Sequence, residues 1–281
     1  MTVVEVFVPA KVNLTLHVTG QREDGFHLID SLAVFADVGD RLRITLPGDG
    51  RLTVEGPMAE GVPVDDSNLV LRAARMTGVR ADFVLEKNLP HAAGLGGGSG
   101  DAAATLRVLA GFAGKPVPAD GIALGTDLPL CLLGRAARVT GIGETVTPLP
   151  GLPALDAVLV NPNRPVPTSQ VFAMLRQKHN PAMPERIPSF HGPADLVDWL
   201  GRQRNDLETP AIEAEPMIAQ VFETLEKTPG CQLARMSGAG GTCFGIYQDA
   251  ETAGSAAGRL AEAFPGWWVV AVRLNAPGRP G

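Results

Sequence analysis

The pattern of apolar and polar positions predicts strands and helices that mix without regular alternation. Strands are indicated where apolar and polar residues alternate or β-branched residues cluster. These segments are 3–8, 14–19, 41–46, 81–86, 135–140, 157–160, 232–236, 243–247 and 267–274. Helical spacing instead marks residues 68–76, 101–113, 194–200, 210–227 and 250–263, the first with Ser67 or Asn68 as its N-cap.

The most proline-dense stretch, residues 162–193, follows a strand-rich first half and precedes a tail of helices and strands. A tail of this kind suits an antiparallel sheet covered by helices on one side. We therefore predict an α+β fold with two lobes. The N-terminal domain, residues 1–155, holds a mixed sheet with helices, and the C-terminal domain, residues 156–281, holds the antiparallel sheet.

Composition narrows the class of protein. Of the 281 residues, 45% are hydrophobic and 19% charged, which is enough apolar material for a large buried core. The net charge of −6, without a basic run, argues against a nucleic-acid partner. No apolar stretch reaches the ~18–20 residues of a membrane helix, and the opening residues do not resemble a signal peptide. Three cysteines without a CxxC pair fit a reducing compartment, so we expect a cytoplasmic protein.

The most informative segment is the glycine-rich loop LPHAAGLGGGSGDAAA at residues 89–104, between a predicted strand and an alanine-rich helix. Closely spaced glycines allow backbone N–H groups to converge on an anion, and the start of a helix adds further N–H groups. The sequence lacks a GxxxxGK[ST] phosphate loop, since its Gly114–Lys115 pair is followed by Pro116. A dinucleotide loop would need a regular βαβ setting. A flexible surface turn is the alternative, but the direct junction with a helix favours polyphosphate binding.

The segment PHAAGLGGGSGDAAA, residues 90–104, resembles the central motif of the GHMP kinases. Its triple glycine followed by Ser and Asp is most similar to the diphosphocytidyl-methylerythritol kinase branch. Three more segments resemble family signatures in the expected order, at residues 9–31, 125–144 and 236–247. The resemblance implies a GHMP-kinase-like fold and an ATP-dependent kinase acting on a substrate hydroxyl.

Lys11 and Asp127 match the catalytic pair of that family. A carboxylate close to an ammonium group stays ionised and can accept the proton of a hydroxyl. From position alone, a buried salt bridge would explain both residues, and Asp127 could equally be a helix N-cap. The resemblance favours catalysis.

The resemblance also implies which residues bind ATP and the substrate. Asn68, which could instead be a plain N-cap, matches a residue near the adenine, and the loop around the phosphates comprises Pro90, His91, Ala92, Ala93, Gly94, Leu95, Gly96, Gly97, Gly98, Ser99 and Gly100. Residues that match substrate contacts are Asn13, Phe26, His27, Thr168 and Phe172. His27 would hydrogen-bond cytosine, and Phe26 with Phe172 would sandwich its ring. For Phe172 core packing, and for His27 an ordinary strand-end position, are the alternatives.

The implied reaction transfers phosphate from ATP to the 2-hydroxyl of diphosphocytidyl-methylerythritol in isoprenoid-precursor synthesis. Mg²⁺ is expected with the nucleotide and no protein ligand is named, because Gly100 stands where a second hydroxyl residue is common. We expect only a small-molecule substrate and ATP as partners, in a monomer or weak homodimer. Two alternatives stay open, namely a GHMP kinase of homoserine or mevalonate type and a non-catalytic nucleotide or sugar sensor.

Overall fold

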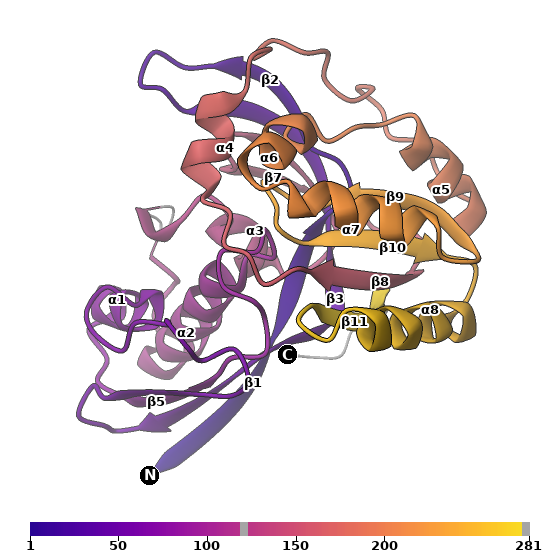
Figure 1. The fold of residues 1–281 in the computed structure, drawn as a ribbon. Coiled ribbons are helices and arrows are strands. Elements are labelled where there is room, and N and C mark those ends of the chain that lie inside the picture. Colours follow the sequence, from indigo (N-terminus) through magenta and orange to yellow (C-terminus); the bar gives the residue numbers. More distant parts are fainter. Residues whose placement is uncertain (119–122, 277–281) are drawn as a thin grey trace.

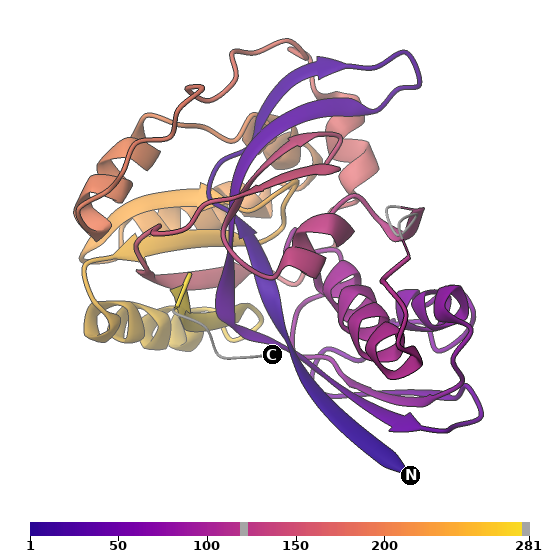
Figure 2. The ribbon, with the colours of Figure 1, turned by 180° about the vertical axis from the view of Figure 1, so that it is seen from behind.

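The computed structural model describes residues 1–118 and 123–276, and it is built around two long antiparallel strands. These are β1 (Thr2–Asn13) and β3 (His27–Leu46), which run side by side through the molecule (Figure 2). Strand β3 also pairs with β2 (His17–Gln21), β5 (Asp82–Glu86) and β6 (Ala137–Gly141). Strand β4 (Leu52–Glu55) adds to β5 in parallel, and β7 (Thr145–Pro148) adds to β6. This part of the sheet is therefore mixed.

The remaining strands are all antiparallel, in the order β9 (Cys231–Met236), β10 (Cys243–Tyr247), β8 (Leu155–Asn161) and β11 (Trp268–Leu274). They join the first part where Leu274 of β11 pairs with Ala36 of β3. Their side chains alternate between two cores, as the period of a strand requires. Leu159 belongs to one core, and its neighbours Val158 and Val160 belong to the other.

Helices cover this sheet on both faces (Figure 1). Helices α1 (Leu69–Thr77), α2 (Gly97–Ala113) and α3 (Leu128–Leu133) pack with the N-terminal strands. Helices α6 (Glu208–Ala214), α7 (Met217–Glu226) and α8 (Ala250–Ala263) cover one face of the C-terminal strands, next to α4 (Thr168–Met174). Helix α5 (Pro193–Gly201) contributes Trp199 to the core on the opposite face.

The α+β fold predicted from the sequence is confirmed, and several element boundaries are corrected. Helix α2 begins at Gly97, four residues before the predicted start. The predicted helix 210–227 is two helices, because Pro216 cannot donate the hydrogen bond that would continue α6. The strand at 41–46 is only the end of β3, while β4, β7, α3 and α4 were not predicted. In the described part of the chain, every helix is too short or too polar to cross a bilayer.

Candidate active site

Three segments that are distant in sequence meet at the end of β1. The backbone N–H of Lys11 donates to the carbonyl of Leu95, at 2.9 Å, in the glycine-rich loop. The hydroxyl of Ser237, in the second glycine loop, accepts from the N–H of Asn13 at 3.1 Å and donates to the carbonyl of Gly94 at 2.9 Å. Gly94 has φ +71°, and a Cβ atom there would overlap the carbonyl oxygen of Ser237. The contact between the two loops therefore requires glycine.

Lys11 and Asp127 lie in direct contact at this junction. The Lys11 ammonium lies 3.1 Å from Oδ2 of Asp127 and donates to Oδ1 of Asn13 at 2.7 Å. The lysine side chain is 4% exposed and the aspartate side chain 39%, so the carboxylate is the partner that solvent and ligands can reach. Asp127 precedes α3, but its side chain makes no capping hydrogen bond. Asp127 nevertheless occupies the N-cap position of α3, so both explanations offered from its position, the N-cap and the salt bridge, are met.

The glycine-rich loop runs directly into α2. Gly96 is the N-cap with φ +65°, and Gly97 to Gly100 form the first helical turn. The first N–H groups of a helix have no partner within it, and they lie at the positive end of its dipole. Ala93 and Leu95 anchor the loop because their side chains are buried in the core. What the loop presents to a ligand is thus mainly backbone.

Two cavities meet beside Asp127. One, of about 350 Å³, is lined by the loop and by Asn68, and the other, of about 720 Å³, is lined by Lys11 and the β2–β3 turn. Gly94, Asp127 and Thr168 line both. A group transferred from a ligand in one cavity to a ligand in the other would pass the Asp127 carboxylate.

The smaller cavity collects the residues predicted for ATP, with one exception. Asn68 and every loop residue from Pro90 to Ser99 line it. Gly100 does not, because it is buried and a Cβ atom there would lie 2.7 Å from Cγ1 of Val8 on β1. Asn68 is also the N-cap of α1, since its Oδ1 accepts from the N–H of Val70 at 2.9 Å. Both explanations offered for Asn68 thus fit its position.

The larger cavity brings together all five residues predicted for substrate, namely Asn13, Phe26, His27, Thr168 and Phe172. The rings of His27 and Phe172 are stacked with centroids 4.9 Å apart, while Phe26 is 50% exposed. Nε2 of His27 is buried without a hydrogen-bond partner among the residues that the structure describes. Burial, and then the charge of Lys178, lower the pKa of His27, so its imidazole is neutral near pH 7. A neutral ring offers one donor and one acceptor nitrogen.

A buried charge cluster beneath the glycine-rich loop was not predicted. The Lys87 ammonium donates to Asp40 and, at 3.0 Å, to Asp101. A Cβ atom at Gly97 would lie 3.3 Å from Nζ of Lys87, so the cluster directly supports the first turn of α2. Burial raises the pKa of Asp101 to about 7, although the charge of Lys87 opposes this. The sequence signal that could have indicated this cluster is Lys87 itself, a lone lysine at the end of a strand and just before the glycines.

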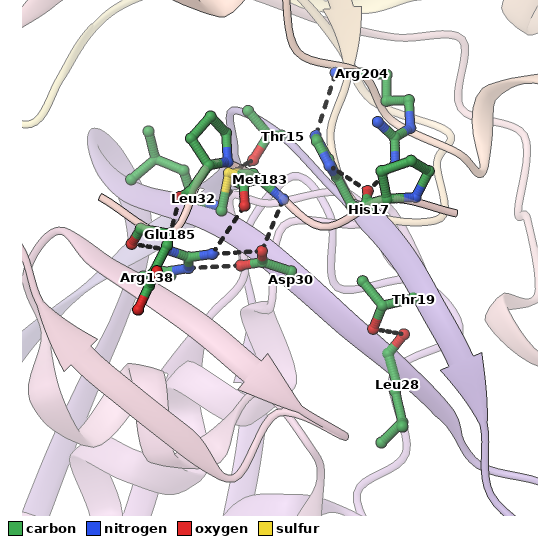
Figure 3. A network of polar contacts seen from close by, with 12 residues as sticks. Thr15, His17, Thr19, Leu28, Asp30, Leu32, Arg138, Met183, Glu185 and Arg204 are labelled. Carbon is green, nitrogen blue, oxygen red and sulfur yellow. Dashed lines mark hydrogen bonds and ion pairs between the residues drawn. The ribbon is translucent and has the colours of Figure 1, made fainter. Parts of the chain in front are cut away.

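A strap of residues 177–187 braces strands β3 and β6 (Figure 3). The Arg138 guanidinium binds both carboxylate oxygens of Asp30 on β3, at 2.8 and 2.6 Å, and donates to the carbonyls of Met183 and Glu185. Nearby, Lys178 donates to Gln21, the residue paired with His27 across the hairpin. The strap therefore fixes the hairpin that carries Phe26 and His27.

Comparisons with known proteins agree with this geometry. Family models of the GHMP kinases match residues 68–135 for the N-terminal domain and 188–266 for the C-terminal domain. A 4-diphosphocytidyl-2-C-methyl-D-erythritol kinase of Dinoroseobacter shibae is 55% identical over 96% of this chain and 94% of its own length. The chain belongs to this family of GHMP kinases. The crystal structure of a 4-(cytidine 5'-diphospho)-2C-methyl-D-erythritol kinase superposes on the kinase described here with a TM-score of 0.77 and 32% identity, covering 98% of this chain and all of the other.

A more distant GHMP kinase shares only the fold. The homoserine kinase of Cytophaga hutchinsonii has a TM-score of 0.65 with 17% identity, over 96% of this chain and 94% of its own. The prediction of an ATP-dependent phosphotransferase with the GHMP-kinase fold is confirmed. The roles of individual residues stay predictions, and they are developed below.

Proposed function

We propose that this kinase transfers the γ-phosphate of ATP to the 2-hydroxyl of 4-diphosphocytidyl-2-C-methyl-D-erythritol. The observation that carries the proposal is the position of Asp127, in contact with Lys11, where the two cavities meet. ATP occupies the cavity of the glycine-rich loop, and the cytidylated substrate occupies the larger cavity. Phosphoryl transfer needs alignment and charge stabilisation more than covalent chemistry from the protein.

In this proposal, Asp127 accepts the proton of the substrate hydroxyl as its oxygen attacks the γ-phosphorus, and ADP leaves into the smaller cavity. Lys11 stabilises the charge on the transferred group, and the N–H groups at the start of α2 hold the other phosphates. Mg²⁺ bound with ATP would neutralise part of the phosphate charge. We expect phosphates and water to supply most of its ligands, because Gly100 brings no second hydroxyl side chain to the loop.

Recognition of the cytidine is assigned to the hairpin side of the larger cavity. The unpartnered Nε2 of His27 supports this, since a buried polar atom without a partner is costly unless a ligand satisfies it. Phe172 holds the imidazole by stacking, and Phe26 lies on the same wall of the cavity. We propose that cytosine stacks on these aromatic residues while His27 hydrogen-bonds its polar edge.

The test is an assay of ATP consumption by the purified kinase with four acceptors supplied separately. We expect turnover with diphosphocytidyl-methylerythritol and little with galactose, homoserine or mevalonate. Preference for homoserine or mevalonate would support the alternative GHMP kinase, and binding of nucleotide without turnover of any acceptor would support the sensor. Sedimentation of the same sample tests the proposed monomer or weak homodimer.

A further inference from the structure

Ser31, on β3, connects the catalytic junction to the interior of the sheet. Its side chain is completely buried. Its hydroxyl oxygen lies 2.5 Å from the carbonyl oxygen of Thr15 and 2.7 Å from Nδ2 of Asn13. Asn13 in turn accepts, through Oδ1, from the ammonium of Lys11. A continuous chain of hydrogen bonds thus runs from Thr15 through Ser31 and Asn13 to Lys11.

The directions of these bonds follow from the chemistry of the groups. A carbonyl oxygen can only accept, so the single hydrogen of the Ser31 hydroxyl must be donated to Thr15. Ser31 can then only accept from its other neighbour, which must be the NH₂ group of Asn13. The carbonyl oxygen of that amide is thereby turned towards Lys11, which has only hydrogens to offer. Ser31 and Lys11 together select one of the two orientations of the Asn13 amide.

This orientation determines how the Lys11 ammonium is used. Of its three hydrogens, one is directed to Asn13 at 2.7 Å and one to Asp127 at 3.1 Å. The third is left for the phosphoryl group that passes between the cavities. We propose that Ser31 is a positioning residue for phosphoryl transfer, acting through Asn13 on the ammonium of Lys11. This inference rests on the proposed role of Lys11.

The test combines Ser31→Ala, Asn13→Ala and the double variant. We expect Ser31→Ala to lower kcat roughly ten- to hundredfold, since small displacements of a catalytic group have effects of that size. KM for ATP should change little, because Ser31 does not line the ATP cavity. If Ser31 acts through Asn13, the double variant should be no slower than Asn13→Ala alone. Multiplying losses, or a folded Ser31→Ala with the kcat of wild type, would overturn the inference.

A matched control removes a different hydroxyl, outside both cavities. The Thr228 hydroxyl donates to the carbonyl of Leu225 at 2.6 Å and lies 2.6 Å from the hydroxyl of Tyr247. Thr228→Val removes these contacts, and Thr228 lines neither cavity. It should lower Tm with kcat unchanged. A kcat loss in Thr228→Val equal to that of Ser31→Ala would show a structural effect only and overturn the inference.

Two further variants keep the outcome interpretable. If Ser31→Ala does not fold, Ser31→Cys retains a weaker donor and acceptor, and it should give an intermediate kcat. A folded Ser31→Cys with full kcat would count against the inference in that case. Lys11→Met tests the proposed function itself. Normal turnover in Lys11→Met would remove the role of Lys11, whereas an inactive Lys11→Met beside a normal Ser31→Ala would remove only the inference about Ser31.

Discussion

Asp127 is the residue on which the proposed chemistry depends most directly. Asp127→Asn keeps the shape of the side chain but removes the proton acceptor. A positioned general base contributes roughly a hundred- to ten-thousandfold in rate, so kcat should fall by about that factor. ATP binding, measured by calorimetry, should be largely kept. Asp195→Asn, an exposed aspartate in the first turn of α5, is the control with unchanged turnover. Near-normal kcat in Asp127→Asn would refute the assignment.

Asp101 predicts a dependence of stability on pH. Burial raises its pKa to about 7 in the folded protein, from an ordinary value near 3.8. The folded state therefore binds this proton more tightly than the unfolded state, and the stabilisation from the neutral form is lost as pH rises from about 4 through about 7. The free energy of unfolding of wild type, relative to that of Asp101→Asn, should therefore fall as pH rises over this range.

Denaturant titrations of both proteins at several pH values measure this difference. Asp82→Asn is a control, because Asp82 is solvent-accessible and a hydrogen bond from the backbone N–H of Arg51 lowers the pKa of its carboxyl. The stability that its carboxylate contributes is lost only at acidic pH. A difference between wild type and Asp101→Asn that stays constant across neutral pH would contradict the raised pKa of Asp101.

Among individual residues, the sequence predicted those that belong to recognisable motifs. Lys11, Asp127 and the five substrate residues were named from the sequence, and the structure gathers them around the two cavities. Ser31 and Lys87 were not named, since their roles depend on partners brought close by the fold. Lys87 meets Asp40 from 47 positions away, and no local periodicity encodes that contact.

Among the elements, the start of α2 shows why glycine-rich segments are hard to predict. Four residues with low helix propensity precede Asp101, so propensity and periodicity placed the start too late. The predicted strand 41–46 covered only the end of β3 for a different reason. Asp30 to Val34 are buried in succession, so the apolar–polar alternation of a half-buried strand is absent. Ala33 packs with Leu130 of α3 on one face, while Leu32 and Val34 join the core formed with β8 and α5 on the other. Helix α4 was hidden in the proline-dense stretch and begins directly after Pro167.

The proposed phosphate site at the start of α2 is tested best at Gly98. A side chain at Gly97 would press on the Lys87 cluster. Within residues 1–118 and 123–276, a Cβ atom at Gly98 would meet only Cδ1 of Leu69, at 3.2 Å. Gly98→Val should weaken ATP binding about tenfold or more, because its branched side chain obstructs the approach of phosphate to the N–H groups. Gly111→Val is the matched control, since Gly111 lies in the same helix with open space around it.

Calorimetry with ATP and thermal melting of both variants test whether the phosphates of ATP bind at the start of α2. We expect Gly111→Val to lower Tm slightly while ATP affinity stays at the wild-type value. Unchanged ATP affinity in a folded Gly98→Val would show that the phosphates bind elsewhere. An equal loss in both variants would indicate a general effect on the helix.

For the whole molecule, the fold joins two halves so that each supplies part of both cavities. Strand β1, the glycine-rich loop and Asp127 come from the first half, while Thr168, Phe172 and the second glycine loop come from the second. The class of fold followed from the sequence. The joining of both halves into one sheet through β11 could not be predicted from the sequence. A single pair of residues on distant strands makes that connection.

The proposed division of labour between the cavities predicts how the kinase selects its substrate. Binding energy from the cytidine is used far from the reacting hydroxyl, so it should hold the reactive end in place during transfer. A truncated methylerythritol phosphate should therefore lose kcat as well as affinity. His27→Ala should lower kcat/KM for the cytidylated substrate roughly ten- to hundredfold, because a polar edge of the base is left unpaired in a buried site.

The decisive comparison is kcat/KM for both substrates in wild type, His27→Ala and His191→Ala. His27→Ala should bring the two substrates closer together, because it removes a contact that only the cytidylated substrate makes. ATP affinity should be unchanged, since His27 lines only the larger cavity. His191 is exposed and lies outside both cavities, so His191→Ala should behave as wild type. If wild type uses both substrates equally well, the aromatic wall does not read the base, and the larger cavity must select its substrate by the polyol phosphate alone.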